Sequence, residues 1–425
     1  MDKLLVRGGA TLKGAVHISG SKNASLPILA ATLLTDQPCI IRRVPDVSDT
    51  NYMIQILAAL GAEVERSSGT VRITAGEISP NAPYEIVRKM RASICVMGPL
   101  LARLHKASVS LPGGCVIGDR PVDLHLKGLE ALGANIDMEG GNMHITAVDG
   151  LHGKEVDLRG KHGPTVLGTD NLMMAAVLAE GITVIESAAC EPEVVDLANF
   201  LIKMGAKIEG AGSSRVTITG VKKLHGAEHT VIPDRIEAGT FMVVAAMAGC
   251  PENGVTLHRI CEADLVPSSE KLIESGHSVE FNEAGTSCVV KPATDPKGAN
   301  IVTAPFPGFP TDMQAQFTAL YAVTSGISVV EDTIFPQRFM HCAEMTRMGA
   351  DIKVDNGTAV IQGTENMSGA PVMASDLRAS AALVLAALCS KGTTEINRLY
   401  HIDRGYENID DKLVMLGADI ERVRE

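Results

Sequence analysis

The chain has 425 residues, a net charge of −12 at pH 7 and aromatic residues at only 3% of its positions. This length predicts about two to three domains, each large enough to bury a core, and it excludes a small scaffold that depends on disulfides. The acidic balance argues against binding to nucleic acid or to an anionic membrane surface, because both need clustered Lys and Arg.

Nine cysteines are scattered along the chain without a CxxC pair or a His/Cys cluster. We therefore expect neither a disulfide framework nor a metal site, and we expect the reducing cytoplasm as the location. The longest apolar runs, such as ASAALVLAALC, stop well short of about 18 residues, so no membrane span is predicted.

A short tag recurs six times, roughly 70 residues apart. It reads LGAEV, LGANI, MGAKI, SGHSV, MGADI and LGADI, with glycines at Gly61, Gly133, Gly205, Gly276, Gly349 and Gly417. This pattern is typical of an amphipathic helix that ends at a left-handed glycine and turns directly into a strand. The sequence therefore predicts six repeats.

A second strand is predicted about ten residues after each of the first five tags, starting at Val71, Met143, Val216, Cys288 and Ala359. The chain ends too soon after the sixth tag to supply this strand. The N-terminal sequence LLVRGG, from Leu4, has the missing pattern. We therefore expect residues 1–21 to complete the sixth repeat.

Each repeat also begins with a predicted strand that runs into a helix, and polar or charged residues mark these six junctions. They are Lys22, Arg91, Lys161 with His162, Asp234 with Arg235, Asp312, and Arg378. Helix N-termini have free N–H groups and a partial positive charge, so junctions with Lys and Arg are natural anion sites. A single charge at a helix start is often only a cap, and the hypothesis therefore depends on the whole set.

Strand and helix units of this kind predict an α/β fold, in which three repeats about a pseudo-threefold axis form one compact domain. The predicted domains are residues 22–232, and residues 1–21 together with 233–425. The helices exclude a propeller. An open solenoid is harder to exclude from periodicity alone, but completion of the sixth repeat by the N-terminus favours closed domains.

Residues 111–125, LPGGCVIGDRPVDLH, combine a thiol with two side chains that can carry positive charge in one short segment. Pro112, Gly113 and Gly114 predict an irregular backbone that presents Cys115 on a loop. A buried small hydrophobe is the commonest fate of a free cysteine, and this loop alone does not decide between that fate and a functional thiol. Arginines such as Arg120 bind phosphate or carboxylate in bidentate fashion.

The chain resembles the enolpyruvyl transferase family over essentially its whole length, and most closely the members that use a nucleotide sugar. The stretches that carry the resemblance are GSKNASLPILAATLL, MRAS, LPGGCVIGDRPVDLHL, TAPFPGFPTDMQAQ, QRFMH, DLRAS and HIDRGYENIDDKL. The resemblance implies two domains, each an inside-out α/β barrel of three repeated strand-helix units. It also implies a cytoplasmic enzyme with no metal and no cofactor.

The implied reaction moves the enolpyruvyl group of phosphoenolpyruvate to the 3′-hydroxyl of UDP-N-acetylglucosamine and releases phosphate, the first committed step of peptidoglycan synthesis. By resemblance, Cys115 is the acid that protonates C3 and can form a covalent adduct, and Asp312 is the base near the sugar hydroxyl. Lys22, Arg120 and Arg404 match groups that hold phosphoenolpyruvate. The further implied substrate-binding residues are Asn23, Arg91, Pro121, Val122, Asp123, Leu124, Lys161, Thr165, Ile334, Arg338 and Arg378.

Some alternatives stay open. Arg91 and Arg378 could be structural cations at their junctions, and the stretch GKHGPTVLGTDN around Lys161 and Thr165 differs from the family's nucleotide-contact segment. A 5-enolpyruvylshikimate-3-phosphate synthase-like transferase would share the fold and the phosphoenolpyruvate chemistry, although that enzyme lacks the PGGC loop. A non-catalytic protein that binds UDP-N-acetylglucosamine is the other alternative, and retention of Cys115 and Asp312 argues against it.

Fosfomycin, a phosphonate epoxide, tests the interpretation of Cys115. Because an exposed, reactive thiolate attacks an epoxide, we expect the protein to gain one inhibitor mass at Cys115 in the presence of UDP-N-acetylglucosamine. Mass spectrometry of the intact protein and of its peptides measures the adduct. Protein that stays unmodified under these conditions would count against a reactive thiol.

Overall fold

The computed structural model describes residues 2–111 and 122–424, which form a mixed α/β fold with several sheets. The described residues fall into two compact units. The N-terminal unit contains residues 20–111 and 122–232, and the C-terminal unit contains residues 2–19 and 233–424.

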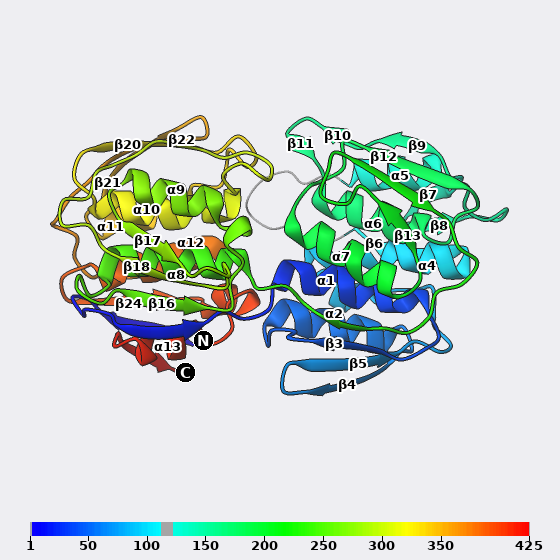
Figure 1. Cartoon of the computed structure of the whole chain (residues 1–425), viewed down its shortest axis with the longest axis horizontal. Helices are drawn as coiled ribbons and strands as arrows, with labels where there is room; N and C mark the ends of the chain where they lie inside the picture. Colours follow the sequence, from blue (N-terminus) through cyan, green and yellow to red (C-terminus); the bar gives the residue numbers. More distant parts are fainter. Residues whose placement is uncertain (1, 112–121, 425) are drawn as a thin grey trace. The chain divides into compact units, whose positions relative to one another are not determined.

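The N-terminal unit has three main sheets (Figure 1). In the order of their hydrogen bonding, the strands are β15 (Glu228–Thr230), β3 (Cys39–Arg42), β5 (Thr70–Thr74) and β4 (Glu63–Ser67); β6 (Lys106–Ser110), β8 (Asn142–Thr146) and β7 (Asn135–Glu139); and β9 (Glu155–Asp157), β12 (Ile182–Glu186), β14 (Arg215–Thr219) and β13 (Lys207–Glu209). A two-residue ladder joins β10 (Arg159–Gly160) to β11 (Gly163–Pro164).

The C-terminal unit also has three sheets. Their strands are β2 (Gly14–His17), β16 (Val255–His258), β18 (Ser287–Lys291) and β17 (Ser278–Phe281); β19 (Ile301–Val302), β20 (Ile327–Glu331), β22 (Thr358–Gln362) and β21 (Asp351–Asp355); and β23 (Pro371–Met373), β24 (Thr393–Asn397), β1 (Lys3–Arg7) and β25 (Asp419–Val423).

All six sheets share one pattern of strand pairing. A first strand pairs in parallel with a second, and two antiparallel strands follow across the sheet. In the sheet of β6, β8 and β7, an isolated parallel bridge between Asn81 and Ser108 takes the place of the first strand. The repeats inferred from the sequence are therefore visible as six related sheets.

The six glycine tags end helices as predicted. The helices are α2 (Ser48–Ala59), α5 (Asp123–Ala131), α7 (Pro192–Lys203), α9 (Val266–Glu274), α11 (Met340–Arg347) and α13 (Ile409–Met415). Each tag glycine has a φ between 92° and 105°, which only glycine adopts without strain. The next N–H donates to a carbonyl five residues back, as from Ala62 to Leu57 and from Ala418 to Leu413, each at 3.0 Å. This hydrogen bond is the helix-ending pattern that lets a strand start directly afterwards.

The five predicted second strands are confirmed as β5, β8, β14, β18 and β22. The sixth is β1, which lies between β24 and β25 and pairs with both (Figure 1, dark blue beside red). The prediction that all of residues 1–21 complete the sixth repeat is wrong, because β2 pairs in parallel with β16 in the sheet of the fourth repeat. Likewise β15, at the end of the third repeat, pairs with β3 of the first.

Each unit is built around helices that are buried on all sides. In the C-terminal unit, α8 (Arg235–Ala248), α10 (Gln314–Val323) and α12 (Leu377–Leu388) pack against one another, and nearly every residue of each is buried. In the N-terminal unit, α6 (Val166–Ala176) packs against α1 (Lys22–Ala31) and α4 (Met97–Leu104). Helices without a polar face belong in a core, and their Ala-rich sequences allow close packing.

The short helices are η1 (Thr32–Leu34), α3 (Tyr84–Val87), η2 (Arg91–Val96), η3 (Glu262–Asp264), η4 (Thr311–Met313) and η5 (Leu399–Arg404). Two of them begin or end at predicted site residues, Arg91 and Arg404, and a third contains Asp312. Arg91 and Asp312 therefore lie in short helices that lead directly into the buried helices α4 and α10.

Replacing Gly133 with Ala tests the helix-ending role of the tags. A Cβ there has room, with its nearest neighbour at 3.8 Å, so the cost comes from the φ of 101° and we expect the free energy of unfolding to fall by about 1–2 kcal/mol. Urea unfolding followed by circular dichroism measures it. The control is Gly76→Ala in the same unit, where φ is outside the left-handed region and no atom lies within 4 Å. Equal stability of the two variants would contradict the account.

Candidate active site

Asp312 lies between two arginines in the C-terminal unit. Its carboxylate accepts a hydrogen bond from Nη1 of Arg338 at 2.7 Å and from Nη2 of Arg378 at 2.9 Å. Asp312 comes from η4, just before α10, whereas Arg378 comes from the first turn of α12. The structure therefore brings together three of the residues that the sequence placed in the site.

The charges of this ion cluster are strongly coupled. Burial alone would raise the pKa of the Asp312 carboxyl, but the guanidinium groups of Arg378 and Arg338 hold that pKa well below its usual range. Burial alone would likewise lower the pKa of Arg378, and the charge of Asp312 raises it instead. Two cations share one carboxylate, so the cluster carries a net positive charge.

Three N–H groups of the two arginines have no acceptor among the described residues. They are Nε of Arg338 and both Nε and Nη1 of Arg378, and all three atoms are buried. The side chains are only 6% and 3% exposed. A buried donor without an acceptor is costly, so these groups favour an anionic ligand that supplies one.

A cap and a folded loop hold the two arginines in place. Asp376 caps α12 and accepts hydrogen bonds from the N–H groups of Arg378 and Ala379, at 2.9 and 3.1 Å. Asp332 accepts from the N–H groups of Ile334 and Phe335, which folds the loop that leads to Arg338. Helix capping of this kind fixes the direction in which a first-turn side chain leaves the helix.

The hydroxyl of Thr311 links the loop to the ion cluster. It donates to Asp332 at 2.6 Å and accepts from Nη1 of Arg338 at 3.3 Å. Ile334, a predicted sugar contact, is partly buried in this loop. Arg404 is partly buried at the end of η5, two residues before Tyr406, whose ring lies under Arg378 at 5.3 Å.

Lys22 forms a buried ion pair in the N-terminal unit. Its Nζ lies 2.9 Å from Oδ2 of Asp49, and the two side chains are 14% and 2% exposed. Lys22 begins α1 and Asp49 lies in the first turn of α2, so the pair joins two helix starts. Asn23 and Arg91 are partly buried, the latter at the start of η2.

The predicted nucleotide-contact residues lie around the start of α5 and the hairpin of β10 and β11. Val122 is the N-cap residue of α5, followed by Asp123 and Leu124. A Cβ added to Gly160 would come within 3.0 Å of Cδ1 of Leu124, so the hairpin and α5 are in close contact there.

Lys161 is exposed in the turn of this hairpin. Thr165 caps α6 by accepting a hydrogen bond from the N–H of Gly168 at 3.2 Å. These two predicted contacts therefore lie on either side of β11, within five residues of each other. Cys115, Arg120 and Pro121 lie outside the described residues.

Sequence reasoning missed several residues that hold the site. It did not assign Asp49, the partner of Lys22, or Asp332, Thr311 and Tyr406, which contact the arginine cluster or its loop. The usable signal was a polar residue at a helix start, which Asp49 has in α2 and Thr311 has in η4. The other two act through contacts that only the folded chain brings together.

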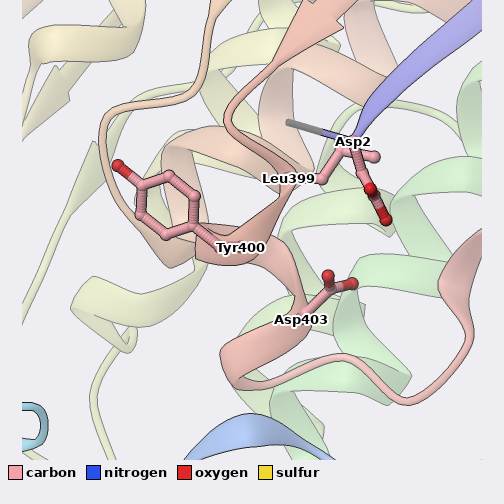
Figure 2. Close-up of a pocket in the computed structure, with 4 residues that line it drawn as sticks. All are labelled: Asp2, Leu399, Tyr400 and Asp403. Atoms are coloured by element: carbon pink, nitrogen blue, oxygen red, sulfur yellow. The ribbon is translucent and has the colours of Figure 1, made fainter. Parts of the chain in front are cut away.

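A cavity of about 200 Å³ in the C-terminal unit is lined by Asp2, Leu399, Tyr400 and Asp403 (Figure 2). None of these was predicted as a site residue. Asp2 and Asp403 both pair with Arg422, so each of these carboxylates already has a cationic partner within the protein. We therefore place the candidate site at the arginine cluster and not in this cavity.

Within residues 2–111 and 122–424, no three His, Cys, Asp or Glu side chains are grouped so as to hold a metal ion. No helix there combines the length and the apolar character that crossing a membrane requires.

Comparison with known proteins gives a consistent result. The sequence model of the EPSP synthase family, described as 3-phosphoshikimate 1-carboxyvinyltransferase, matches residues 6–413. A relative from Akkermansia muciniphila is 69% identical over 100% of this chain and 99% of its own length, and one from Methylacidiphilum infernorum is 55% identical over the same shares. Both are named UDP-N-acetylglucosamine 1-carboxyvinyltransferase.

Among solved structures, the enolpyruvyl transferase NikO from Streptomyces tendae aligns with a TM-score of 0.88. The alignment covers 99% of each chain at 24% sequence identity. This likeness shows that the two chains have the same fold.

Replacing Asp312 with Asn tests the ion cluster, because it leaves two buried guanidinium groups without a carboxylate. We expect the free energy of unfolding to fall by about 3–5 kcal/mol at pH 7. The pKa of Asp312 is lowered in the folded state, so its stabilisation is complete above the unfolded pKa of about 3.9 and is lost as the pH falls through the folded pKa. Urea unfolding at several pH values measures this difference.

The matched control is Asp419→Asn, which removes an exposed carboxylate from its pair with Arg7 in the same unit. We expect a loss of about 0–1 kcal/mol there. A loss for Asp312→Asn no larger than the control's would show that the arginines do not depend on this carboxylate.

Proposed function

Since the chain belongs to the EPSP synthase family, we propose that it transfers the enolpyruvyl group of phosphoenolpyruvate to the 3′-hydroxyl of UDP-N-acetylglucosamine and releases phosphate. The observation that carries this function is the full-length identity to relatives named for this transfer. The reaction is the first committed step of peptidoglycan synthesis. A cytoplasmic location belongs to the same proposal.

The buried arginines support this proposal physically. Phosphoenolpyruvate carries a phosphate and a carboxylate, and the buried N–H groups of Arg338 and Arg378 that lack acceptors are suited to such oxygens. Lys22, Arg120 and Arg404 are proposed to hold the same substrate, and Asn23 and Arg91 to line the site. Charged donors fixed before the ligand arrives stabilise developing charge without having to reorganise.

The proposed chemistry uses one acid and one base. The Cys115 thiol gives a proton to C3 of phosphoenolpyruvate, the 3′-hydroxyl oxygen of the sugar attacks C2, and Asp312 takes the hydroxyl proton. The resulting tetrahedral ketal loses a proton from C3 and its phosphate, which restores the enol ether on the sugar.

The ion cluster affects how well Asp312 can act as the base. While both arginines bind Asp312, the low pKa of its carboxyl makes it a weak proton acceptor. Anionic groups of the substrate that bind Arg338 or Arg378 would weaken these bonds and raise the pKa of Asp312. Substrate binding would thereby bring the base closer to its working range.

Nucleotide binding is proposed for the segment around the start of α5 and the hairpin of β10 and β11. The proposed contacts are Pro121, Val122, Asp123, Leu124, Lys161 and Thr165, with Ile334 as a contact to the sugar. The packing of Leu124 against Gly160 supports a shared surface for the α5 start and the hairpin.

We also propose that the two compact units are two domains, each an inside-out α/β barrel of three repeats. Six sheets with one pattern of strand pairing and the buried helices of each unit support this arrangement. The proposed domains are residues 22–232, and residues 1–21 with 233–425.

The match to the EPSP synthase family favours a second candidate, transfer of the same group to shikimate 3-phosphate. The chemistry at phosphoenolpyruvate would be unchanged, and only the acceptor would differ. A non-catalytic protein that binds UDP-N-acetylglucosamine is the further alternative.

Phosphate release distinguishes these functions. With phosphoenolpyruvate and UDP-N-acetylglucosamine, and no added metal, we expect release of inorganic phosphate in an amount equal to the acceptor consumed. A colorimetric phosphate assay measures it, with the acceptor omitted as the control. Release with shikimate 3-phosphate in place of the nucleotide sugar would support the second candidate. If folded protein released no phosphate with either acceptor, the proposal that it is an enzyme would be contradicted.

A further inference from the structure

A buried polar network of three side chains lies next to the Asp312 and Arg378 pair. Thr240 comes from α8, Gln316 from α10, and Tyr406 from the segment after η5. All three are buried, with at most 2% of their surface exposed. A fully buried polar network is costly unless every hydrogen bond serves the structure or the site.

The directions of the hydrogen bonds can be assigned. The Thr240 hydroxyl donates to the carbonyl of Ile236 at 2.7 Å, so its oxygen is left to accept. The Tyr406 hydroxyl, 2.9 Å from Oγ1 of Thr240, is therefore the donor in that pair. Nε2 of Gln316 lies within donating distance of both the Tyr406 oxygen and Oγ1 of Thr240, at 3.1 Å from each.

The same amide group of Gln316 also reaches the ion cluster. Nε2 lies 3.0 Å from the backbone oxygen of Asp312, at the start of the helix that carries Gln316. This contact ties the peptide group of the proposed base to Thr240 and Tyr406. Displacement of Gln316 would therefore free the backbone next to Asp312.

Tyr406 also supports Arg378 directly. The guanidinium carbon of Arg378 lies 5.3 Å from the centroid of the Tyr406 ring, within the range of a cation–π contact. Burial raises the pKa of the Tyr406 hydroxyl, so it stays a neutral donor at working pH. The charged groups around Arg378 are Asp312 and Asp234, and Tyr406 supplies the aromatic face.

We propose that Tyr406, with Gln316 and Thr240, is a positioning residue that holds Arg378 and Asp312 in the geometry needed for phosphoenolpyruvate. The inference rests on the proposed function, because it takes these two residues as substrate contacts. The proposal gives Tyr406 a role through Arg378 and Gln316, not through contact with the reacting atoms. Its ring fixes the guanidinium plane, and its hydroxyl fixes the amide of Gln316, which holds the Asp312 backbone.

Substitutions that separate the ring from the hydroxyl test this inference. Tyr406→Phe keeps the ring under Arg378, and we expect kcat/KM for phosphoenolpyruvate to fall only about 5-fold, the effect of one hydrogen bond. Tyr406→Leu removes the ring as well, and we expect a fall of about 100-fold, because small errors in the position of a catalytic group are costly. The loss should lie mainly in KM for phosphoenolpyruvate.

The pH profile gives a readout that a purely structural role would not change. In Tyr406→Leu, a displaced Arg378 should lower the pKa of Asp312 less, so the acidic limb of kcat/KM should move to higher pH. Tyr406→Phe should keep the wild-type limb. Gln316→Leu should lower kcat with a smaller change in KM, because it frees the Asp312 backbone.

Tyr321 provides the matched control. It is a fully buried tyrosine on α10 in the same unit, its ring packs on Phe317, and no contact with Arg378 is recorded for it. Tyr321→Phe and Tyr321→Leu lose the same atoms from the same core. Assayed below their unfolding temperatures, they should keep kcat/KM within about 2-fold of wild type and an unshifted pH profile, because mutations away from the site change stability more than catalysis.

The outcomes separate the two levels of the proposal. If the wild-type protein releases no phosphate, the proposed function fails before any variant is compared. If the wild type is active but Tyr406→Leu matches Tyr321→Leu in KM and in pH profile, the positioning role is overturned. If Tyr406→Leu does not fold, Tyr406→Phe and Gln316→Leu still test the proposal. Wild-type activity in both of these variants would contradict a positioning role for the network.

Discussion

The carboxylate of Asp312 is the group on which the candidate site depends. It is the shared ion-pair partner of two buried guanidinium groups, those of Arg338 and Arg378. Removing one partner of a buried ion pair costs more stability than the intact pair contributes. Loss of any one of the three residues should therefore destabilise the other two. The cluster still has one more positive charge than negative. That excess, with three N–H groups lacking acceptors, explains why the site favours an anion.

The fold supplies this cluster through the starts of its buried helices. Asp312 precedes α10, Arg378 lies in the first turn of α12, and Asp234 caps the start of α8. Because these three helices pack against one another, their N-termini bring residues far apart in the chain into contact. The N-terminal unit repeats the device with Lys22 at the start of α1 and Asp49 at the start of α2.

The repeats could be predicted because their signals are local. A glycine such as Gly61 with φ of 105° ends a helix wherever the chain continues, and the pattern of the next strand lies in the adjacent residues. The pairing of β2 with β16 could not be predicted, because it joins residues more than 200 positions apart and nothing in β2 itself specifies its partner. The strand was recognised, but its sheet was not.

The charged residues of the site could be predicted from the sequence. The uncharged residues that hold them in place could not. Lys22, Asp312 and Arg378 stand at helix starts and in motifs that resemble a known family, so sequence alone selected them. Tyr406 and Gln316 also lie in stretches that resemble this family, but neither is charged, and their role follows only once the fold places them beside Arg378 and Asp312. Residues that act by holding others have no signal of their own in a single sequence.

NMR analysis of the product formed from phosphoenolpyruvate labelled with 13C at C2 is the most decisive test of the proposed transfer. The labelled enol carbon should become bonded through oxygen to C3 of the N-acetylglucosamine ring, with phosphate released in equal amount. Label that stays in phosphoenolpyruvate, or that is transferred only to shikimate 3-phosphate, would contradict it.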